Sequence, residues 1–435
     1  MAVAAIDAVL SDMVFVTEGH RLREWNIDIR GVWRPEDFVS RPADAAYQND
    51  NAKDGDASIN IRVSRKDLGH GESRFFFAKE IAVAGVRGCL RPLSFPRAIL
   101  SLMRTHHRVI VITGASAGVG RATARAFARE GARIGLIARG REGLDGARRD
   151  VKELGGEALV LPVDVADADA VKQAAAQVEH QFGAIDVWVN NAMTSVFASI
   201  KETPAEEFRR VSAVTYLGCV NGTLAALKYM LPRNKGIIIQ VGSALAYRGI
   251  PLQAAYCAAK HAVQGFVDSL RCELIHDKSK VRVTMIQMPA LNTPQFGWVK
   301  SRLPRKAQPV PPIYQPEIAA EAIVYASHHP RREIYVGLPT IKAIIGNKVF
   351  PGVLDHYLGR TGYDAQQYNG PEDRDRPDNL WQPVPGDHGA HGDFDSRAQR
   401  LSPQLWTTTH RGLIVAAALV FGAAALAELL RRRTD

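Results

Sequence analysis

Between residues 106 and 340 the chain alternates short apolar runs with longer stretches of helical periodicity, and this alternation limits the possible folds more than any other feature. Short apolar runs are typical of buried strands, and a repeating strand–helix pattern predicts a parallel sheet with helices on both faces. We therefore expect an α/β protein with a doubly wound, mostly parallel sheet of about seven strands. The expected strands are 109–112, 133–138, 158–161, 186–189, 237–241, 281–286 and 333–336.

A glycine-rich turn follows the first expected strand and opens the next helix. Gly114, Gly118 and Gly120 allow a tight turn, a close approach of the backbone to a pyrophosphate, and close helix–strand packing. The spacing is G-x-x-x-G-x-G, and a glycine turn alone is weak evidence. Its position inside a strand–helix–strand unit favours nucleotide binding, with Ser116 and Val119 in the same turn as further contacts.

The end of the second strand bears on the choice of nucleotide. A carboxylate at this position would bind a ribose 2′-hydroxyl, whereas a basic group can hold a 2′-phosphate. Arg139 stands there, with Arg141 and Arg121 as possible neighbours and no competing acid. The alternative is an ordinary solvated arginine. We expect NADP(H) rather than NAD(H).

A serine, a tyrosine and a lysine point to acid–base chemistry on a carbonyl. Tyr256 and Lys260 are four residues apart on an expected helix, so their side chains share one face. The tyrosine has a reference pKa of about 10, and a nearby ammonium would favour its phenolate. Ser243 follows the strand 237–241, at the edge of the sheet where α/β proteins bind ligands. A solvated helix face that carries the two residues by chance is the alternative.

Together these residues resemble the short-chain dehydrogenase/reductase family over about residues 106–340. The resemblance rests on Thr113-Gly114-x-x-x-Gly118-x-Gly120, Asp164, Asn190-Asn191-Ala192, Ser243 and Tyr256-x-x-x-Lys260. It implies a single Rossmann-fold domain and an NAD(P)(H)-dependent oxidoreductase acting on alcohols or carbonyls. It also implies that Tyr256 exchanges the proton, that Lys260 binds the nicotinamide ribose, and that Ser243 orients the reacting oxygen.

The resemblance further implies a set of cofactor contacts beyond the glycine turn. Asp164 would lie near the adenine, and Asn190 would help to hold the cofactor. The loop after the sixth strand would cover the nicotinamide carboxamide. The remaining expected cofactor contacts are Val165, Ala192, Pro289 and Thr293.

Two positions depart from the family pattern. Thr215 stands where the family usually has an asparagine that holds a proton-relay water, so we expect a modified relay in which Thr215 takes part. Pro289-Ala290 replaces the common Pro-Gly, and we expect the loop to keep its role.

Charge and composition narrow the class of ligand. The formal net charge is +10, from 55 basic and 45 acidic residues. No nucleic-acid-binding pattern accompanies this excess, so we expect a small phosphorylated ligand and no nucleic acid. The four scattered cysteines suggest a reducing compartment. Acidic and histidine residues between Asp387 and Asp395 superficially resemble metal ligands, but we expect no metal site there.

The chain outside the α/β region divides into three expected parts. Residues 1–105 show no sustained periodicity and are interpreted as a poorly ordered extension, or as an unnatural addition before a start at Met103. Residues 341–410 are rich in Pro, Gly and Asp and read as a polar linker. Residues 411–435 contain an uncharged run, 412–427, that reads as an apolar helix.

This apolar run predicts a membrane anchor at the C-terminus. A helix of these residues would be roughly 24 Å long, close to the hydrocarbon core of about 30 Å, and arginines flank it. A shallow or re-entrant insertion would keep the catalytic domain in the cytoplasm. A helix that packs on the domain or between subunits is the alternative.

The sequence therefore predicts an NADP(H)-dependent oxidoreductase that interconverts a carbonyl and an alcohol, possesses no metal, and is associated with a membrane. A non-catalytic NADP(H)-binding sensor or scaffold on the same fold is the alternative function. A tether would favour lipophilic substrates, and the family resemblance implies a homo-oligomer.

Overall fold

The computed structural model describes residues 107–373, 375–414, 416, 419, 421 and 431. The expected N-terminal extension, residues 1–105, lies outside these residues. So do most residues of the expected C-terminal apolar helix.

A seven-stranded parallel sheet forms the centre of the domain. Its strand order is β3-β2-β1-β4-β6-β7-β11, and every neighbouring pair is parallel. The sequence prediction of a doubly wound parallel sheet is confirmed. The strands are β1 (Val109–Thr113), β2 (Arg133–Ala138), β3 (Glu157–Pro162), β4 (Val187–Asn190), β6 (Ile237–Val241), β7 (Arg282–Gln287) and β11 (Glu333–Tyr335).

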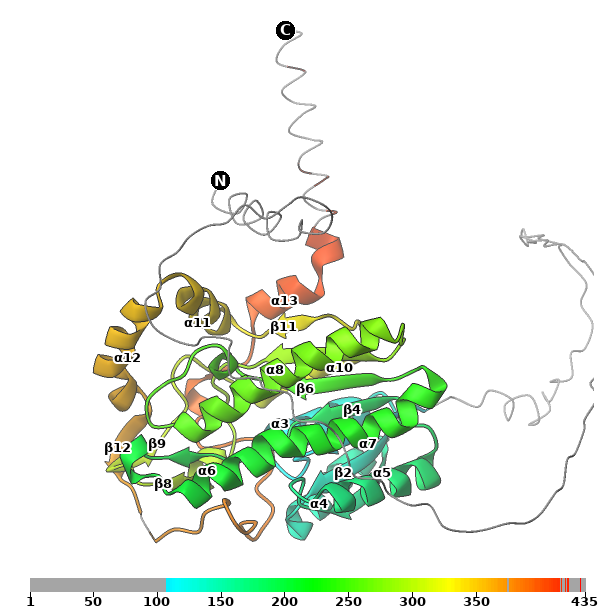
Figure 1. Cartoon of the computed structure of the whole chain (residues 1–435), viewed down its shortest axis with the longest axis horizontal. Coiled ribbons are helices and arrows are strands. Elements are labelled where there is room, and N and C mark those ends of the chain that lie inside the picture. The colour runs from blue at the N-terminus through cyan, green and yellow to red at the C-terminus, as the bar shows by residue number, and fades with distance from the viewer. Residues whose placement is uncertain are drawn as a thin grey trace, which may run out of the picture. The chain divides into compact units, whose positions relative to one another are not determined.

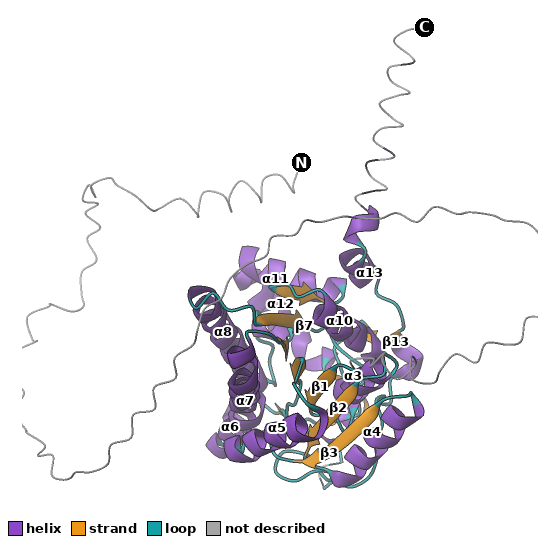
Figure 2. Cartoon of the chain, turned by 90° about the vertical axis from the view of Figure 1, so that its right-hand side faces the viewer, coloured by secondary structure: helices purple, strands orange, loops and turns teal. Residues whose placement is uncertain are grey.

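Two layers of helices cover the sheet, one on each face (Figure 2). Two apolar clusters join these helices to the sheet. One cluster contains Phe127, Leu144 and Ile318 and lies on one face of the sheet, and the second cluster lies on the opposite face. The first layer comprises α3 (Gly118–Ala128), α4 (Arg141–Glu153) and α10 (Pro316–His328). The second comprises α5 (Ala168–Phe182), α7 (Gly218–Arg233) and α8 (Ala254–His276), with α6 (Ala205–Ser212) before α7.

The strand order reverses between β1 and β4, and this reversal creates the crevice in which the candidate site lies. In a doubly wound sheet the connections leave β1 and β4 toward opposite faces, so a gap opens beyond their carboxyl ends. The glycine turn after β1 and the Asn191 turn after β4 both enter this gap.

Short strands, helices and turns lie in the connections between the sheet and the helical layers. The paired short strands are β5 (Val196–Phe197) with β8 (Lys300–Ser301), β9 (Arg305–Ala307) with β12 (Gln367–Pro371), and β10 (Ile313–Tyr314) with β13 (Ala398–Gln399). The remaining short helices are α9 (Gln295–Trp298), the 3-10 turns Ile200–Glu202, Ala244–Ala246 and Asp395–Arg397, and a π-helical turn, Ala213–Leu217.

Residues 341–410 differ from the expected polar linker, because they fold onto the domain. Two helices, α11 (Leu338–Val349) and α12 (Pro351–Ala365), form a hairpin at one edge of the domain (Figure 1). The extended segment Arg376–Asp395, here called the strap, then crosses the crevice. Its composition hides this role, because only isolated apolar residues such as Leu380 and Phe394 are buried, while much of the attachment is made by main-chain carbonyls.

The described part of the chain ends in α13 (Pro403–Thr409) and the helical residues 411–414. Among the residues that the structure describes, no helix combines the length and the apolarity that crossing a bilayer requires. The predicted anchor at 411–435 otherwise falls on residues outside the description.

Candidate active site

The glycine turn has the geometry expected of a phosphate cradle. Gly118 has φ +56°, in the left-handed region that favours glycine. A Cβ on Gly120 would lie 2.1 Å from the carbonyl oxygen of Gly114, so this position admits only glycine. The Nδ2 of Asn191 donates to the carbonyls of Thr113 and Gly114 and fixes the turn against the end of β4. The turn is therefore fixed at the end of the crevice.

A cavity of about 750 Å³ runs from this turn past the expected catalytic residues. Most of the sequence-predicted site residues line it. They are Gly114, Ser116, Gly118, Val119, Arg139, Asp164, Val165, Ala192, Ser243, Tyr256, Lys260, Pro289 and Thr293. Gly120, Asn190 and Thr215 do not line it.

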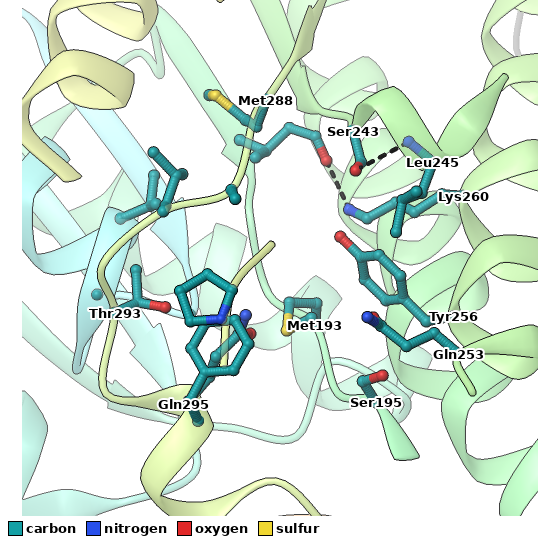
Figure 3. A pocket seen from close by; sticks show the side chains of 18 of the residues that line it. Met193, Ser195, Ser243, Leu245, Gln253, Tyr256, Lys260, Met288, Thr293 and Gln295 are labelled. Carbon is teal, nitrogen blue, oxygen red and sulfur yellow. Dashed lines mark hydrogen bonds between the residues drawn. The ribbon is translucent and has the colours of Figure 1, made fainter. Parts of the chain in front are cut away.

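Ser243, Tyr256 and Lys260 converge on one wall of the cavity (Figure 3). Ser243 follows β6 and accepts a hydrogen bond from the main-chain N–H of Leu245 at 3.1 Å. Lys260 on α8 donates from Nζ to the carbonyl of Val241 at 2.7 Å. Its Nζ lies 5.6 Å from the centroid of the Tyr256 ring, and the Tyr256 hydroxyl points toward Lys260 and Ser243. The four-residue helical step thus places both groups on one face, as the spacing predicts.

The electrostatics of this wall differ from the expectation for Tyr256. Burial raises the pKa of Tyr256 above its ordinary value, and the Ser243 hydroxyl only partly offsets the increase. Burial also lowers the pKa of Lys260 to about 8. The buried Lys260 ammonium donates its hydrogen bond to the carbonyl of Val241. In the cofactor-free protein, Lys260 does not lower the pKa of Tyr256. Tyr256 is therefore a protonated phenol at neutral pH, which suits a proton donor.

Thr215 lies behind the cavity wall and fixes a loop. It is buried in the π-helical turn, where its Oγ1 donates to the carbonyl of Thr194 at 3.0 Å and accepts from the N–H of Thr194 at 3.1 Å. π-Helical turns are rare in proteins, and those that occur are often found near functional sites. The Thr215 hydroxyl thereby positions the loop that carries Met193 and Ser195 into the cavity. Its expected place in a proton relay stays a prediction.

Of the two consecutive asparagines at the end of β4, Asn191 lines the cavity, and Asn190, the expected cofactor contact, does not. Asn190 is buried beneath the sheet edge, where it accepts from Trp188 Nε1 at 2.8 Å and donates to Thr223 at 3.0 Å. Asn191 lines the cavity and holds the glycine turn. The strand pattern gives the signal that separates them, because consecutive residues of a strand alternate between faces.

The opposite end of the cavity carries charged groups. The Asp164 carboxylate pairs with Arg210 at 2.5 Å. Although burial opposes the effect, hydrogen bonds from Ala166 and Arg210 hold the pKa of Asp164 below its usual range. Arg139 donates to the main-chain carbonyls of Asn379, Leu380 and Trp381. Arg139 thus occupies the predicted place at the end of β2, with the strap as its partner.

The strap closes this end of the cavity, and its residues were not predicted as part of the site. Asp387 pairs with Arg121 at 2.9 Å and with Arg149 at 3.3 Å. The carbonyl of Gly389 accepts from the N–H of Gly118 at 3.0 Å. Pro383, Val384, Gly386 and His388 of the strap line the cavity. Asp387 is therefore part of a latch over the glycine turn.

Other charged residues of the strap, among them His391 and Asp395, also have protein partners. His391 contacts both Glu317 and Asp395, and these carboxylates raise its pKa although burial opposes them. Within the described residues, no group of three or more His, Cys, Asp and Glu is arranged to hold a metal ion.

One further polar group in the cavity has no partner. Ser195 is almost fully buried, lines the cavity near Tyr256, and its hydroxyl makes no hydrogen bond in the structure (Figure 3). Nothing in the sequence distinguishes it from an ordinary loop serine.

Comparisons with known proteins agree with this geometry. Residues 108–302 match the family model of the short chain dehydrogenases. The uncharacterized oxidoreductase YxnA of Bacillus subtilis is 33% identical over 336 residues, which cover 77% of this chain and 94% of that protein. The chain belongs to the short-chain dehydrogenase family. It is therefore an NAD(P)-dependent oxidoreductase.

Further similarities cover a smaller part of the chain. The fatty acyl-CoA reductase of Acinetobacter baylyi is 33% identical over 221 residues, covering 50% of this chain and 72% of that protein. Among solved structures, an alcohol dehydrogenase from the archaeon Thermococcus sibiricus, complexed with 5-hydroxy-NADP, is 29% identical with a TM-score of 0.46. The similar region covers 53% of the present chain and 95% of the archaeal enzyme.

Proposed function

We propose that this short-chain dehydrogenase uses NADP(H) to interconvert a lipophilic carbonyl compound and its alcohol, with Tyr256 as the acid–base group. One observation carries the proposal. The glycine turn, Arg139 and the trio Ser243, Tyr256 and Lys260 line one continuous cavity. A dinucleotide seated on the turn would therefore reach the wall that carries the tyrosine.

The residues at the turn fit a dinucleotide. A Cβ on Gly118 would lie 3.2 Å from the Thr293 side chain, so glycine leaves more room at this point of the turn. The Gly118 N–H donates to the carbonyl of Gly389, and a pyrophosphate oxygen would have to replace this partner. Arg139 supplies a guanidinium at the end of β2, which suits a 2′-phosphate. Bound there, the cofactor supplies the hydride.

The protein residues supply the proton and the orientation. Because Tyr256 is protonated at neutral pH, its hydroxyl can donate to the oxygen of a carbonyl as that oxygen gains charge. Ser243 offers a second hydroxyl on the same wall, and Lys260 holds the end of β6 in place through Val241.

Apolar side chains support a lipophilic substrate. The cavity beyond Tyr256 is lined by Phe197, Phe296, Val310, Leu354 and Leu358. A pocket of this kind gains binding free energy by removing alkyl groups from water. The relative from Acinetobacter is named for reduction of a fatty acyl thioester, which is also a long-chain carbonyl compound.

The test is NADPH oxidation with carbonyl compounds of increasing chain length. Tyr256→Phe should lower kcat about 10²- to 10⁴-fold, because it removes the proton donor and leaves the ring in place. Tyr229→Phe, which removes a hydroxyl on α7 away from the cavity, is the matched control and should keep the parent rate. Equal rates for Tyr256→Phe and parent would refute the role of Tyr256. An inactive parent that still binds NADPH would favour a sensor.

A further inference from the structure

The hairpin of α11 and α12, residues 338–365, has an apolar outer surface that the catalytic domain does not use. Each member of this surface is more than half exposed, from 51% for Ile345 to 67% for Val353. Ile345 and Val349 are four residues apart on α11, and Val353 and Tyr357 are four residues apart on α12, so each pair lies on one face of its own helix. The exposed apolar residues are Leu338, Ile345, Val349, Phe350, Val353 and Tyr357.

The same hairpin forms part of the cavity wall with its other face. Ala343 of α11 and Leu354, Leu358 and Gly362 of α12 line the cavity. Tyr357 belongs to both sets, because it lines the cavity and is 58% exposed. The apolar surface therefore lies at the wall of the proposed substrate pocket.

The charges of the hairpin favour an anionic partner. Its two carboxylates are already neutralised, Asp355 by Arg248 and Asp364 by Arg305. Lys348 and Arg360 are exposed and form no ion pair within the described part of the chain. Apolar residues flanked by free cations are typical of a helix that lies in the interface of a negatively charged bilayer.

The position of α13 agrees with the same partner. The Gln404 side chain of α13 accepts a hydrogen bond from the N–H of Gly337, the residue before α11, at 2.7 Å. In Figures 1 and 2 the hairpin and α13 lie at the same end of the domain. Residues 411–414, within which the apolar sequence begins, follow closely after α13.

We propose that the outer face of the α11–α12 hairpin docks on an anionic lipid bilayer and opens the substrate pocket toward the lipid. This inference rests on the proposed function for its substrate, a lipophilic carbonyl compound that partitions into the bilayer. The docking itself does not depend on catalysis. Phe350, at the turn between the helices, would enter the acyl region most deeply.

The full chain carrying Phe350→Trp tests the docking directly. The fluorescence of the added tryptophan is obtained by subtracting the emission of the parent from that of the variant. With vesicles of phosphatidylcholine and phosphatidylglycerol, this difference emission should shift to the blue. Brominated acyl chains should quench it about twofold, because the ring then lies among the chains. Ile275→Trp is the matched control, since Ile275 is 71% exposed at the end of α8, and its added emission should not change.

Three outcomes would overturn the proposal. Vesicle binding without any change at position 350 would mean that another segment holds the chain. A blue shift that grows with protein concentration in the absence of lipid would show that a second copy covers the hairpin. Failure of the full chain to bind anionic vesicles at all would also refute it.

An activity measurement separates this inference from the proposed function. Phe350→Ser combined with Val353→Ser should lower activity about tenfold toward a long-chain carbonyl compound held in anionic vesicles, while activity toward a short, water-soluble one stays at the parent level. Equal losses with both substrates would contradict docking. A parent that docks but oxidises no NADPH would refute the function and leave the docking intact.

Discussion

The two walls of the candidate site, the catalytic wall of β6 and α8 and the strap Arg376–Asp395, are built by different means. On the catalytic wall, Ser243, Tyr256 and Lys260 come from one stretch of 18 residues, and helical periodicity alone brings two of them together. The strap has almost no regular structure. It is held by side chains from elements more than 200 residues earlier, such as Arg121 and Arg139. Local geometry builds the first wall, and long-range polar contacts build the second.

On the catalytic wall the largest expected effect concerns the pH dependence of stability. The pKa of Lys260 is about 8 in the folded protein, below the usual value of 10.5. Between these values the unfolded chain binds the extra proton, so stability rises with pH there and is constant below about pH 8. Relative to Lys260→Met, the free energy of unfolding of the parent should rise by roughly 2–3 kcal/mol from pH 7.5 to pH 10.

Urea unfolding at these two pH values measures this difference, because contributions of other groups cancel between parent and variant. A constant difference would show that Lys260 stays charged in the folded protein. That result would restore the simple view in which its charge acts on Tyr256.

On the opposite side of the cavity, Arg139 should decide the cofactor. Charge-assisted hydrogen bonds contribute about 1.5–3 kcal/mol, so Arg139→Gln should raise KM for NADPH about 10- to 100-fold and leave KM for NADH nearly unchanged. Arg141→Gln is the control, because Arg141 is exposed and, among the residues that the structure describes, forms an ion pair with Asp145 alone. An equal increase for both cofactors would mean that Arg139 acts only by holding the strap.

The order of these residues along the chain explains how much the sequence could predict. All seven strands follow from apolar runs, and Tyr256 and Lys260 follow from helical spacing. The strap could not be found in this way, because Leu380 and Phe394 are single apolar residues in a polar segment. Much of the strap is attached through main-chain carbonyls, which every residue type has, so these contacts cannot be predicted from the identity of the residues. Low apolar density was therefore a poor guide to a free linker.

The increase in the pKa of Tyr256 in the cofactor-free protein could not be predicted from the spacing either. The spacing to Lys260 fixes which face the two side chains share, but not how deeply they are buried. Burial dominates here and acts on both groups, raising the pKa of the phenol and lowering that of the ammonium. The hydrogen bonds of Thr215 could not be predicted either, because its partner Thr194 lies in a loop whose position the sequence does not reveal.

The latch of the strap should have a smaller effect than Arg139. Partly exposed ion pairs contribute up to about 1 kcal/mol each, and Asp387 forms two. Asp387→Ala should therefore raise the dissociation rate of NADPH about 3- to 10-fold, because the strap covers the cavity above the glycine turn. Stopped-flow displacement measures this rate.

Asp393→Ala is the matched control for the latch, since Asp393 is exposed on the same strap and no ion pair to it is seen among the described residues. Slower dissociation, or tighter binding, in Asp387→Ala would reverse the interpretation. The strap would then compete with the cofactor instead of covering it.

The smallest expected effect concerns Ser195, which lines the cavity from the loop after β4. A buried hydroxyl without a partner destabilises a protein, so Ser195→Ala should leave the free energy of unfolding unchanged or raise it by up to about 1 kcal/mol. If the hydroxyl binds the polar end of the substrate, the same variant should raise KM for the carbonyl compound about 3- to 10-fold with little change in kcat. Thr123→Val is the matched control, because Thr123 carries another buried, unpaired hydroxyl, on α3 and outside the cavity. It should affect stability in the same direction and leave KM unchanged, whereas an unchanged KM in both variants would show that Ser195 is no part of the substrate site.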